Sequence, residues 1–321
     1  MRSGKIVCTA PIAQIAVDIL SPFGEIVVAP DGRAGSLVPL LADAIALVVR
    51  GGGVANADVI DAGRYLKVIG RSGAGYESVD IKIATTRRIP IVYVPAAGSR
   101  AVAEAAVAFM TALCKGITYW DQQLKRGNWK SRDQSKPGDL DGATLGIVGL
   151  GNCGQILAQL VRPFNMIVLA YDPYASRDRA KELEVELVSF EETLRRSDFV
   201  SLHAPLTSET RGLVNRQTLK AVKRGAYLIN MARGGLIENL DVLLEALETG
   251  ALGGVGLDVF DPEPPDFTHP LFKHPNCLAS PHALAMTEGA MIKIYKSMAE
   301  DMAAVLRGGR PRFVVNPEVF D

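Results

Sequence analysis

Three side chains in the second half of the chain have the chemistry to reduce a carbonyl group. Arg233 lies in NMARGG, Glu263 in LDVFDPEPP and His282 in SPHALAMT, each near the end of an apolar run. A guanidinium can hold a carboxylate through two hydrogen bonds and polarise an adjoining carbonyl. An imidazole can donate or accept a proton, and a neighbouring carboxylate favours its charged form. Such a triad suits hydride transfer to or from a keto acid, although spacing alone leaves structural roles open for all three residues.

The other three histidines are weaker candidates for acid–base chemistry. His269 and His274 lie in THPLFKHP, a proline-punctuated segment that favours surface roles. His203 follows an apolar run in LHAPLT, where it could line a cofactor site or be structural. His282 is therefore our candidate acid/base.

A glycine-rich turn between two apolar runs predicts a dinucleotide site. The runs TLGIVGL and MIVLAY read as buried strands, and Gly149, Gly151 and Gly154 form G-x-G-x-x-G after the first. These glycines allow a tight turn, backbone approach to a pyrophosphate, and close packing of helix on strand. The start of the following helix offers N–H groups to the phosphates. Asp172 ends the second run and can accept hydrogen bonds from the adenosine ribose, and its charge disfavours the 2′-phosphate of NADP. We therefore expect NAD as the cofactor.

Alternating apolar runs and helical patterns place these residues on two α/β domains. Before residue 95, strands are expected at 6–8, 25–28, 45–49, 66–69 and 91–94, with helices at 12–20, 37–42, 59–62 and 81–86. Beyond Asp172, strands are expected at 185–188, 199–202, 227–230, 256–259 and 277–280, with a helix at 240–247. Strands that alternate with helices form parallel sheets covered on both faces. We predict two doubly wound, parallel-sheet domains of the Rossmann or flavodoxin-like type.

Two long amphipathic helices are expected to connect these domains. One follows Ser99, a candidate N-cap, and the other spans residues 288–306. The tail at 312–317 is expected to pack back on the first domain. The predicted domains are a substrate-binding domain of residues 1–98 and 287–321 and an inserted NAD-binding domain of residues 99–286.

Two arginines of the first domain mark a second candidate site. Arg50 and Arg71 each follow an apolar run, the latter in GRSGAGY. Ligands of open α/β sheets bind at the carboxyl ends of the strands, where both arginines should lie. The backbone N–H groups of Ser72 and Gly73 could add donors for an anion there. Two solvated arginines at strand ends are the alternative.

Composition limits the partners and the compartment. The 321 residues include 35 Lys+Arg and 35 Asp+Glu, so no global charge recruits nucleic acid or an anionic membrane. Four scattered cysteines suggest a reducing compartment and no metal site. No run of about 18 uninterrupted apolar residues occurs, which argues against a membrane span. We expect a cytoplasmic protein, with the polar segment 122–139 as solvated surface.

The ordered motifs resemble those of the D-isomer-specific 2-hydroxyacid dehydrogenases over nearly the whole chain. The segments are GLGNCG, LHAPLTSETRGLVN, NMARGGLIENLDVL, LDVFDPEPP, SPHALAMT and VVNPEV. The resemblance implies that Arg233 binds a small 2-hydroxy or 2-keto acid, that His282 is the general acid/base and that Glu263 is its partner. It also implies a homodimer built on the cofactor domain. Besides the glycines and Asp172, the positions that would line NAD are Asn152, Cys153, His203, Ala204, Pro205, Thr210, Met231, Ala232, Asp258 and Ala285.

Within this family, the segments around Arg50 and Arg71 look most similar to the D-3-phosphoglycerate dehydrogenases. That resemblance implies that both arginines face a substrate phosphate. Gly98 departs from it, because many members have asparagine there. A hydroxypyruvate or glyoxylate reductase is the alternative, whereas Glu263 disfavours the formate dehydrogenases, which carry glutamine at this position. A nicotinamide-sensing interaction module without turnover is an alternative of another class.

Overall fold

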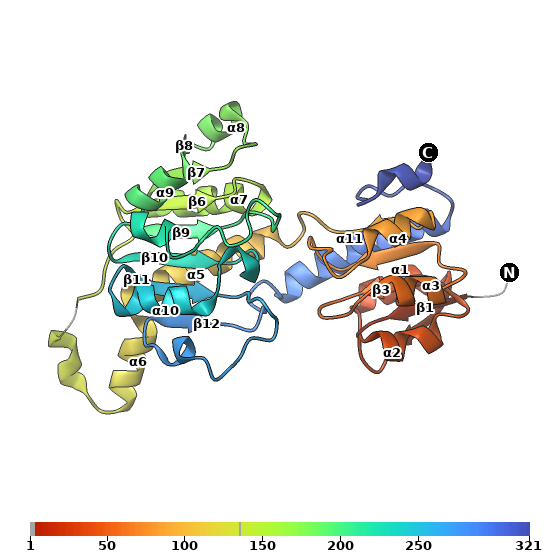
Figure 1. Ribbon diagram of the computed structural model, residues 1–321, viewed down its shortest axis with the longest axis horizontal. Coiled ribbons are helices and arrows are strands. Elements are labelled where there is room, and N and C mark those ends of the chain that lie inside the picture. The colour runs from red at the N-terminus through yellow and green to blue at the C-terminus, as the bar shows by residue number, and fades with distance from the viewer. Residues whose placement is uncertain (1–3, 135) are drawn as a thin grey trace. The chain divides into compact units, whose positions relative to one another are not determined.

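The computed structural model describes residues 4–134 and 136–321, which form two α/β units (Figure 1). Unit 1 comprises residues 4–98 together with 286–321, and unit 2 comprises residues 99–285. Along the chain, unit 2 is therefore inserted between the two parts of unit 1. Each unit contains one wholly parallel sheet, so the predicted fold class is confirmed.

Unit 1 contains a five-stranded sheet with the order β2-β1-β3-β4-β5. The strands are β1 (Gly4–Cys8), β2 (Gly24–Val28), β3 (Ala44–Val49), β4 (Val68–Arg71) and β5 (Ile91–Val92). The helices are α1 (Gln14–Leu20), α2 (Ala34–Leu37), α3 (Ala57–Ala62), α4 (Ile81–Thr86) and α11 (Glu288–Leu306). Side chains of β3 alternate between two apolar clusters, with Leu47 and Val49 in one and Ala46 and Val48 in the other. This period of two shows that the sheet is covered on both faces.

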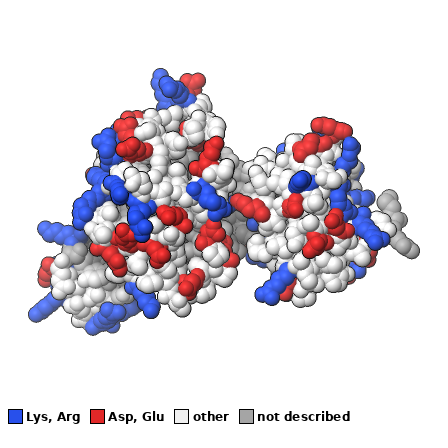
Figure 2. Space-filling view, in the orientation of Figure 1, with Lys and Arg blue, Asp and Glu red and all other residues white. Residues whose placement is uncertain are grey.

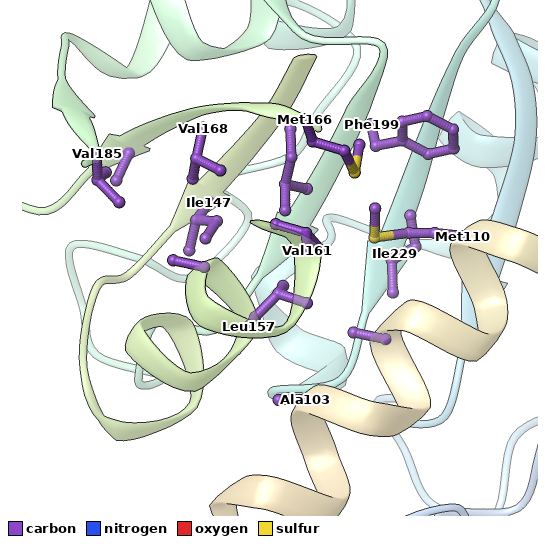
Figure 3. Packing of buried hydrophobic residues seen from close by; sticks show 14 of the residues in the cluster. Ala103, Met110, Ile147, Leu157, Val161, Met166, Val168, Val185, Phe199 and Ile229 are labelled. Carbon is purple, nitrogen blue, oxygen red and sulfur yellow. The ribbon is translucent and has the colours of Figure 1, made fainter. Parts of the chain in front are cut away.

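Unit 2 contains a seven-stranded sheet with the order β12-β11-β10-β9-β6-β7-β8. The strands are β6 (Thr144–Val148), β7 (Ile167–Tyr171), β8 (Glu186–Leu187), β9 (Phe199–Leu202), β10 (Ala226–Asn230), β11 (Leu252–Leu257) and β12 (Cys277–Ala279). The helices are α5 (Ser99–Lys115), α6 (Ile117–Lys125), α7 (Asn152–Val161), α8 (Arg177–Glu182), α9 (Phe190–Arg196) and α10 (Leu240–Glu248). Figure 3 shows Met110 of α5 and Leu157 of α7 in one buried cluster with Ile147, Phe199 and Ile229 of the sheet.

Several predicted elements differ from the structure in their bounds. The helix expected at 37–42 is the short α2 followed by the 3-10 helix η1 (Val38–Leu40), because Pro39 lacks the N–H that would continue an α-helix. Ser99 is the first residue of α5 rather than its N-cap. The strand expected at 256–259 is β11, which begins four residues earlier because Gly253 and Gly254 are part of it. Prediction also missed α6, which the polar composition around residue 122 conceals.

The C-terminal tail packs back on the sheet of unit 1, as predicted. Val314 forms an antiparallel bridge with Val92 of β5. The Asn316 side chain is buried, accepts a hydrogen bond from the Ile91 N–H and donates one to the Ile89 carbonyl. The tail therefore extends the edge of a strand that is only two residues long.

Among the described residues, no single helix has both the length and the apolar composition needed to cross a bilayer. Helices α5 and α6 taken together meet these criteria, but they are bent by 55° at the break between them.

Candidate functional site

Three neighbouring strands of unit 2 end level with one another and carry the predicted triad. Asn230 of β10 is in register with Leu257 of β11, and Leu257 with Ala279 of β12. Arg233, Glu263 and His282 follow these strand ends within six residues. Because the strands are parallel, their carboxyl ends lie along one edge of the sheet (Figure 1).

His282 and Glu263 form a direct pair. The His282 Nδ1 atom lies 2.9 Å from Glu263 Oε2 and 3.1 Å from Oε1. The Phe260 N–H donates to Glu263 Oε1 at 3.1 Å, which fixes the carboxylate. Both side chains are about half exposed. With Nδ1 held by the carboxylate, the Nε2 atom is left to meet a reacting group.

A buried carboxylate holds the loop that carries His282. Asp258 is 2% exposed, and its Oδ1 atom accepts hydrogen bonds from the Ser280 hydroxyl at 2.6 Å and the Ala283 N–H at 3.0 Å. His282 between them has a φ of +53°, a left-handed conformation that costs about 1–3 kcal/mol outside glycine. Asp258 was predicted to line NAD. The structure adds a role in loop positioning that the sequence does not reveal, because Asp258 and the His282 loop are more than twenty residues apart along the chain.

Arg233 is placed by a tight turn after β10. The Asn230 side chain donates to the Arg233 carbonyl and accepts from the Ala232 N–H, at 2.9 and 3.1 Å. The next residue, Gly234, packs so closely that a Cβ atom there would collide with the Phe260 carbonyl. The turn with Arg233 therefore contacts the segment that leads to Glu263. Asn230, which is fully buried, is a site residue that the sequence reasoning missed.

The glycine turn has the geometry needed for a dinucleotide. Gly149 has a φ of +97°, and a Cβ atom there would lie 2.6 Å from the Ala204 nitrogen. A Cβ atom at Gly154 would collide with the Gly149 carbonyl oxygen, so helix α7 packs tightly on β6. At Gly151 a Cβ atom would meet nothing within 4 Å, which leaves space beside the first turn of α7. The N-cap residue of this helix is Gly151, which has no side chain to cap it, and the first turn of a helix is a favourable place for phosphates.

Asp172 lies where a ribose-binding acid is expected. It follows β7, next to β6 in the sheet, and its two carboxylate oxygens accept hydrogen bonds from the Leu150 and Tyr174 N–H groups at 2.8 and 2.9 Å. These bonds fix the carboxylate beside the glycine turn. Each oxygen keeps a further lone pair for a ribose hydroxyl.

The remaining predicted cofactor positions follow the same strand ends of unit 2. The Pro205 carbonyl accepts the Thr210 hydroxyl at 2.6 Å, which closes the turn after β9. Burial raises the pKa of the Cys153 thiol in the first turn of α7, so this thiol is a neutral group. The other positions are Asn152 at the start of α7, Ala204 after β9, Met231 and Ala232 after β10, and Ala285 after the His282 loop.

His203 is a neutral, partly buried side chain in the structure, and its Nδ1 atom is buried. Burial lowers its pKa to about 4. Its Nε2 atom lies 2.8 Å from the Ser201 hydroxyl, so the imidazole is bonded within its own strand end. His203 can therefore shape the cofactor edge, but it cannot act as an acid near neutral pH.

The two remaining histidines are held in the loop before β12. His269 Nε2 lies 3.0 Å from Asp241 Oδ1, and its Nδ1 accepts from the Leu271 N–H. His274 accepts from the Asn276 N–H. Across residues 4–134 and 136–321, no group of three or more His, Cys, Asp or Glu side chains could hold a metal ion.

In unit 1, Arg50 and Arg71 follow adjacent strands. Val49 of β3 is in register with Arg71 of β4, so both arginines lie at the carboxyl edge. The Arg50 guanidinium donates to the Pro11 carbonyl at 2.8 Å, and its N–H donates to the buried Thr9 hydroxyl. The structure therefore brings these two predicted residues together in one unit.

The predicted backbone donors beside them form hydrogen bonds within the protein. The Ser72 N–H donates to the Val49 carbonyl at 3.1 Å, and the Gly73 N–H donates to the Arg71 carbonyl at 2.9 Å. The Ser72 bond continues the pairing of β4 with β3 past its last residue, whereas the Gly73 bond stays within its own segment. An anion at this edge would need side-chain donors instead.

Gly98 has a packing reason in unit 1. A Cβ atom there would lie 3.2 Å from Ile294 Cδ1 on α11, closer than an ordinary contact. A side chain at this position would therefore require the Ile294 side chain to shift by a few tenths of an ångström.

The sequence of this chain is similar to those of known proteins. Residues 107–283 match the family model described as D-isomer specific 2-hydroxyacid dehydrogenase, NAD binding domain. D-3-phosphoglycerate dehydrogenase of Methanocaldococcus jannaschii is 39% identical over 97% of this chain and 59% of its own length. D-3-phosphoglycerate dehydrogenase 2 of Arabidopsis thaliana is 36% identical over 98% of this chain and 51% of its own length. The chain thus spans between half and three fifths of these relatives.

Solved structures match both units of the chain. The TT0316 protein from Thermus thermophilus has a TM-score of 0.90 and 32% identity, with 97% of this chain and 99% of that chain covered. A glyoxylate reductase from Paecilomyes thermophila has a TM-score of 0.88 and 27% identity, with 99% of each chain covered. The chain belongs to the D-isomer-specific 2-hydroxyacid dehydrogenase family, and its matched region is the NAD-binding domain of that family.

Proposed function

We propose that the protein is an NAD-dependent dehydrogenase that interconverts a 2-hydroxy acid and the corresponding 2-keto acid. The observation that carries this proposal is the His282–Glu263 pair, at 2.9 Å, on the strand edge that also presents Arg233. The glycine turn and Asp172 of the same unit suit the cofactor.

Each member of the triad has a separate task. Bound NAD supplies the hydride acceptor, and its reduced form supplies the donor. Arg233 binds the substrate carboxylate through its planar guanidinium and polarises the neighbouring carbonyl. His282 gives a proton from Nε2 to the keto oxygen during reduction and takes one from the hydroxyl during oxidation. Glu263 keeps the ring oriented and stabilises its charged form.

For the substrate, we propose 3-phosphohydroxypyruvate and D-3-phosphoglycerate. Two observations support this choice: the adjacent arginines Arg50 and Arg71 in unit 1, and the names of the curated relatives. A guanidinium pair suits the divalent charge of a phosphate monoester. The alternative is a hydroxypyruvate or glyoxylate reductase, which the resemblance to the solved glyoxylate reductase favours.

The test is NADH consumption with 3-phosphohydroxypyruvate and with hydroxypyruvate, compared by kcat/KM. We expect a strong preference for the phosphorylated acid. A preference for hydroxypyruvate would instead support the reductase and make Arg50 and Arg71 structural. Binding of NADH without turnover of any 2-keto acid would contradict an enzyme and support a nicotinamide-sensing module.

We also propose a cytoplasmic homodimer built on unit 2. Balanced charge supports the first part, and Figure 2 shows acidic and basic side chains interspersed on the visible face of each unit. Exposed apolar side chains on α6 and just after it support the second: Ile117 is 51%, Leu124 62% and Trp129 67% exposed. Exposed apolar side chains that follow one another closely along the chain are typical of protein–protein contacts.

A further inference from the structure

A buried tyrosine of α11 lies at the strand edge that carries Arg50 and Arg71. Tyr295 is 2% exposed and packs with Val48 of β3 and Met298 of α11. Helix α11 crosses β4 closely, since a Cβ atom at Gly70 would collide with the Met302 sulfur. Tyr295 precedes Met302 by two helical turns, and its phenol is close enough to Arg50, Arg71 and Ser72 to interact with them. All of these residues belong to unit 1.

The Tyr295 hydroxyl has no hydrogen-bond partner among the described residues. Leaving such a group unsatisfied in a protein interior costs about 1–3 kcal/mol, so it requires an explanation. The Ser72 hydroxyl is the polar side chain next to it, but it donates to the Val49 carbonyl at 3.4 Å, and no hydrogen bond of normal geometry joins it to the Tyr295 hydroxyl. Among the described residues, Tyr295 is therefore a donor without a well-formed hydrogen bond.

The surroundings of the Tyr295 hydroxyl suit an anion. Burial raises the pKa of Tyr295, and the charges of Arg50 and Arg71 oppose this rise without cancelling it. The phenol is therefore protonated at neutral pH and can only donate to an anionic oxygen. The Ser72 and Gly73 N–H groups are already bonded, so the side chains must supply the donors at this edge.

We propose that the Tyr295 hydroxyl donates a hydrogen bond to the phosphate group of the substrate, beside Arg71 and Ser72. This inference rests on the proposed phosphorylated substrate, and it makes Tyr295 a specificity-determining residue of unit 1. A phosphate monoester has three terminal oxygens, enough for two guanidinium groups and one phenol. A carboxylate has only two oxygens, so it could not accept from all three side chains in this way.

The test is Tyr295→Phe, which removes the hydroxyl and keeps the ring. We expect the KM for 3-phosphohydroxypyruvate to rise by about tenfold or more, as for loss of a hydrogen bond to a charged group. The kcat for this acid and the kcat/KM for hydroxypyruvate should stay within about twofold. The melting temperature without ligand should be unchanged or higher, because the lost hydroxyl had no partner.

The matched control is Tyr65→Phe, which removes a hydroxyl from a 64% exposed side chain of the same unit, before the amino end of β4. It should leave all of these constants unchanged. A lower melting temperature with equal losses on both acids would mean that Tyr295 is only structural. An unchanged KM for the phosphorylated acid would also overturn the proposal.

A second measurement separates Tyr295 from the proposed enzyme function. If the wild type turns over neither acid, or does not prefer the phosphorylated one, the proposed substrate fails. The melting temperatures of the wild type and Tyr295→Phe in inorganic phosphate then decide. The anion site is supported if phosphate raises the melting temperature of the wild type and of Tyr65→Phe by more than it raises that of Tyr295→Phe. If phosphate raises the melting temperatures of all three proteins equally, or raises none of them, the anion site is overturned.

Discussion

At the scale of single residues, polar partners hold the triad in place. Glu263 receives a backbone hydrogen bond from Phe260 and contacts His282 on its other side. Asp258 binds both ends of the turn that contains His282. Hydrogen bonds to a charged acceptor contribute about 1.5–3 kcal/mol each, enough to offset the left-handed backbone of His282. The ring is therefore oriented before substrate arrives.

Replacing His282 by alanine should remove the proton donor. We expect His282→Ala to lower kcat about 10²–10⁴-fold while the Kd for NADH stays within about twofold, because the cofactor residues remain. Steady-state kinetics and NADH fluorescence titration measure the two effects. The control is His274→Ala, which removes a loop imidazole that accepts a hydrogen bond from the Asn276 N–H and should be fully active. Full activity of His282→Ala would exclude this residue from catalysis.

His203 should make stability depend on pH. Its pKa is about 4 in the folded protein, because of burial, and 6.5 is the ordinary value that the unfolded chain regains. At pH values between these two pKa values, the unfolded state binds a proton at His203 and the folded state does not. The free energy of unfolding therefore falls as the pH drops through this range. Linkage gives a loss of about 2 kcal/mol between pH 7 and pH 5.

Urea unfolding of the wild type and His203→Gln at both pH values measures this loss. Other groups titrate in both proteins, so the difference between the two pH dependences isolates His203. The variant should lose about 2 kcal/mol less than the wild type. An equal loss in both proteins would show that the imidazole is charged or solvated in the folded state.

At the scale of elements, unit 1 depends on a tail from the far end of the chain. Strand β5 is two residues long and gains an antiparallel bridge from Val314. The buried Asn316 side chain bonds to the Ile91 N–H at 2.8 Å, to the Ile89 carbonyl and to the Thr85 hydroxyl. These bonds join the first and last segments of unit 1, which are separated by all of unit 2.

Removing the Asn316 amide should destabilise this connection. Asn316→Ala leaves a buried N–H and a buried carbonyl without partners, so we expect a loss of about 2–4 kcal/mol in unfolding free energy. Urea denaturation followed by circular dichroism measures it. Glu318→Ala, an exposed residue of the same tail, should change stability by less than about 0.5 kcal/mol. Equal stability of both variants would mean that the tail adds nothing to the fold.

At the scale of the whole molecule, the two units contain different groups of candidate residues. Unit 2 contains the family's NAD-binding domain and the triad, whereas unit 1 contains the arginine pair and Tyr295. Both units expose large apolar side chains, and two of them, Leu124 and Trp129, lie close together along the chain in unit 2. That cluster is where we place the contact between two copies.

A charge within this cluster should separate the copies. We expect Leu124→Asp to shift the protein from dimer to monomer in light scattering coupled to size-exclusion chromatography, because an aspartate would be buried at the interface. The control is Phe267→Asp, which places the same charge on a 73% exposed residue elsewhere in unit 2. A wild-type monomer, or a dimer that survives Leu124→Asp, would contradict this interface.

Local sequence pattern was sufficient to predict most of the strands. The strand at Phe199–Leu202 and the helices Ile81–Thr86 and Glu288–Leu306 match their predicted ranges residue for residue. Each is marked by apolar periodicity and by flanking polar residues within the same short window. The elements that were missed lack such a window: α6 is rich in polar residues, and Gly253 and Gly254 conceal the start of β11.

The sequence by itself determined the parallel α/β class, the glycine turn with Asp172, and the residue types of the triad, because these depend on side chains close together along the chain. The tertiary structure decided what depends on distant partners. It places His282 against Glu263 and joins Asp258 to the His282 loop. It also bonds the Ser72 and Gly73 N–H groups within the protein, and it gives the Tyr295 hydroxyl no hydrogen-bond partner in the part of the chain that the structure describes. A hydrogen bond between residues far apart in sequence exists only after the strands have aligned, so composition and spacing cannot reveal it.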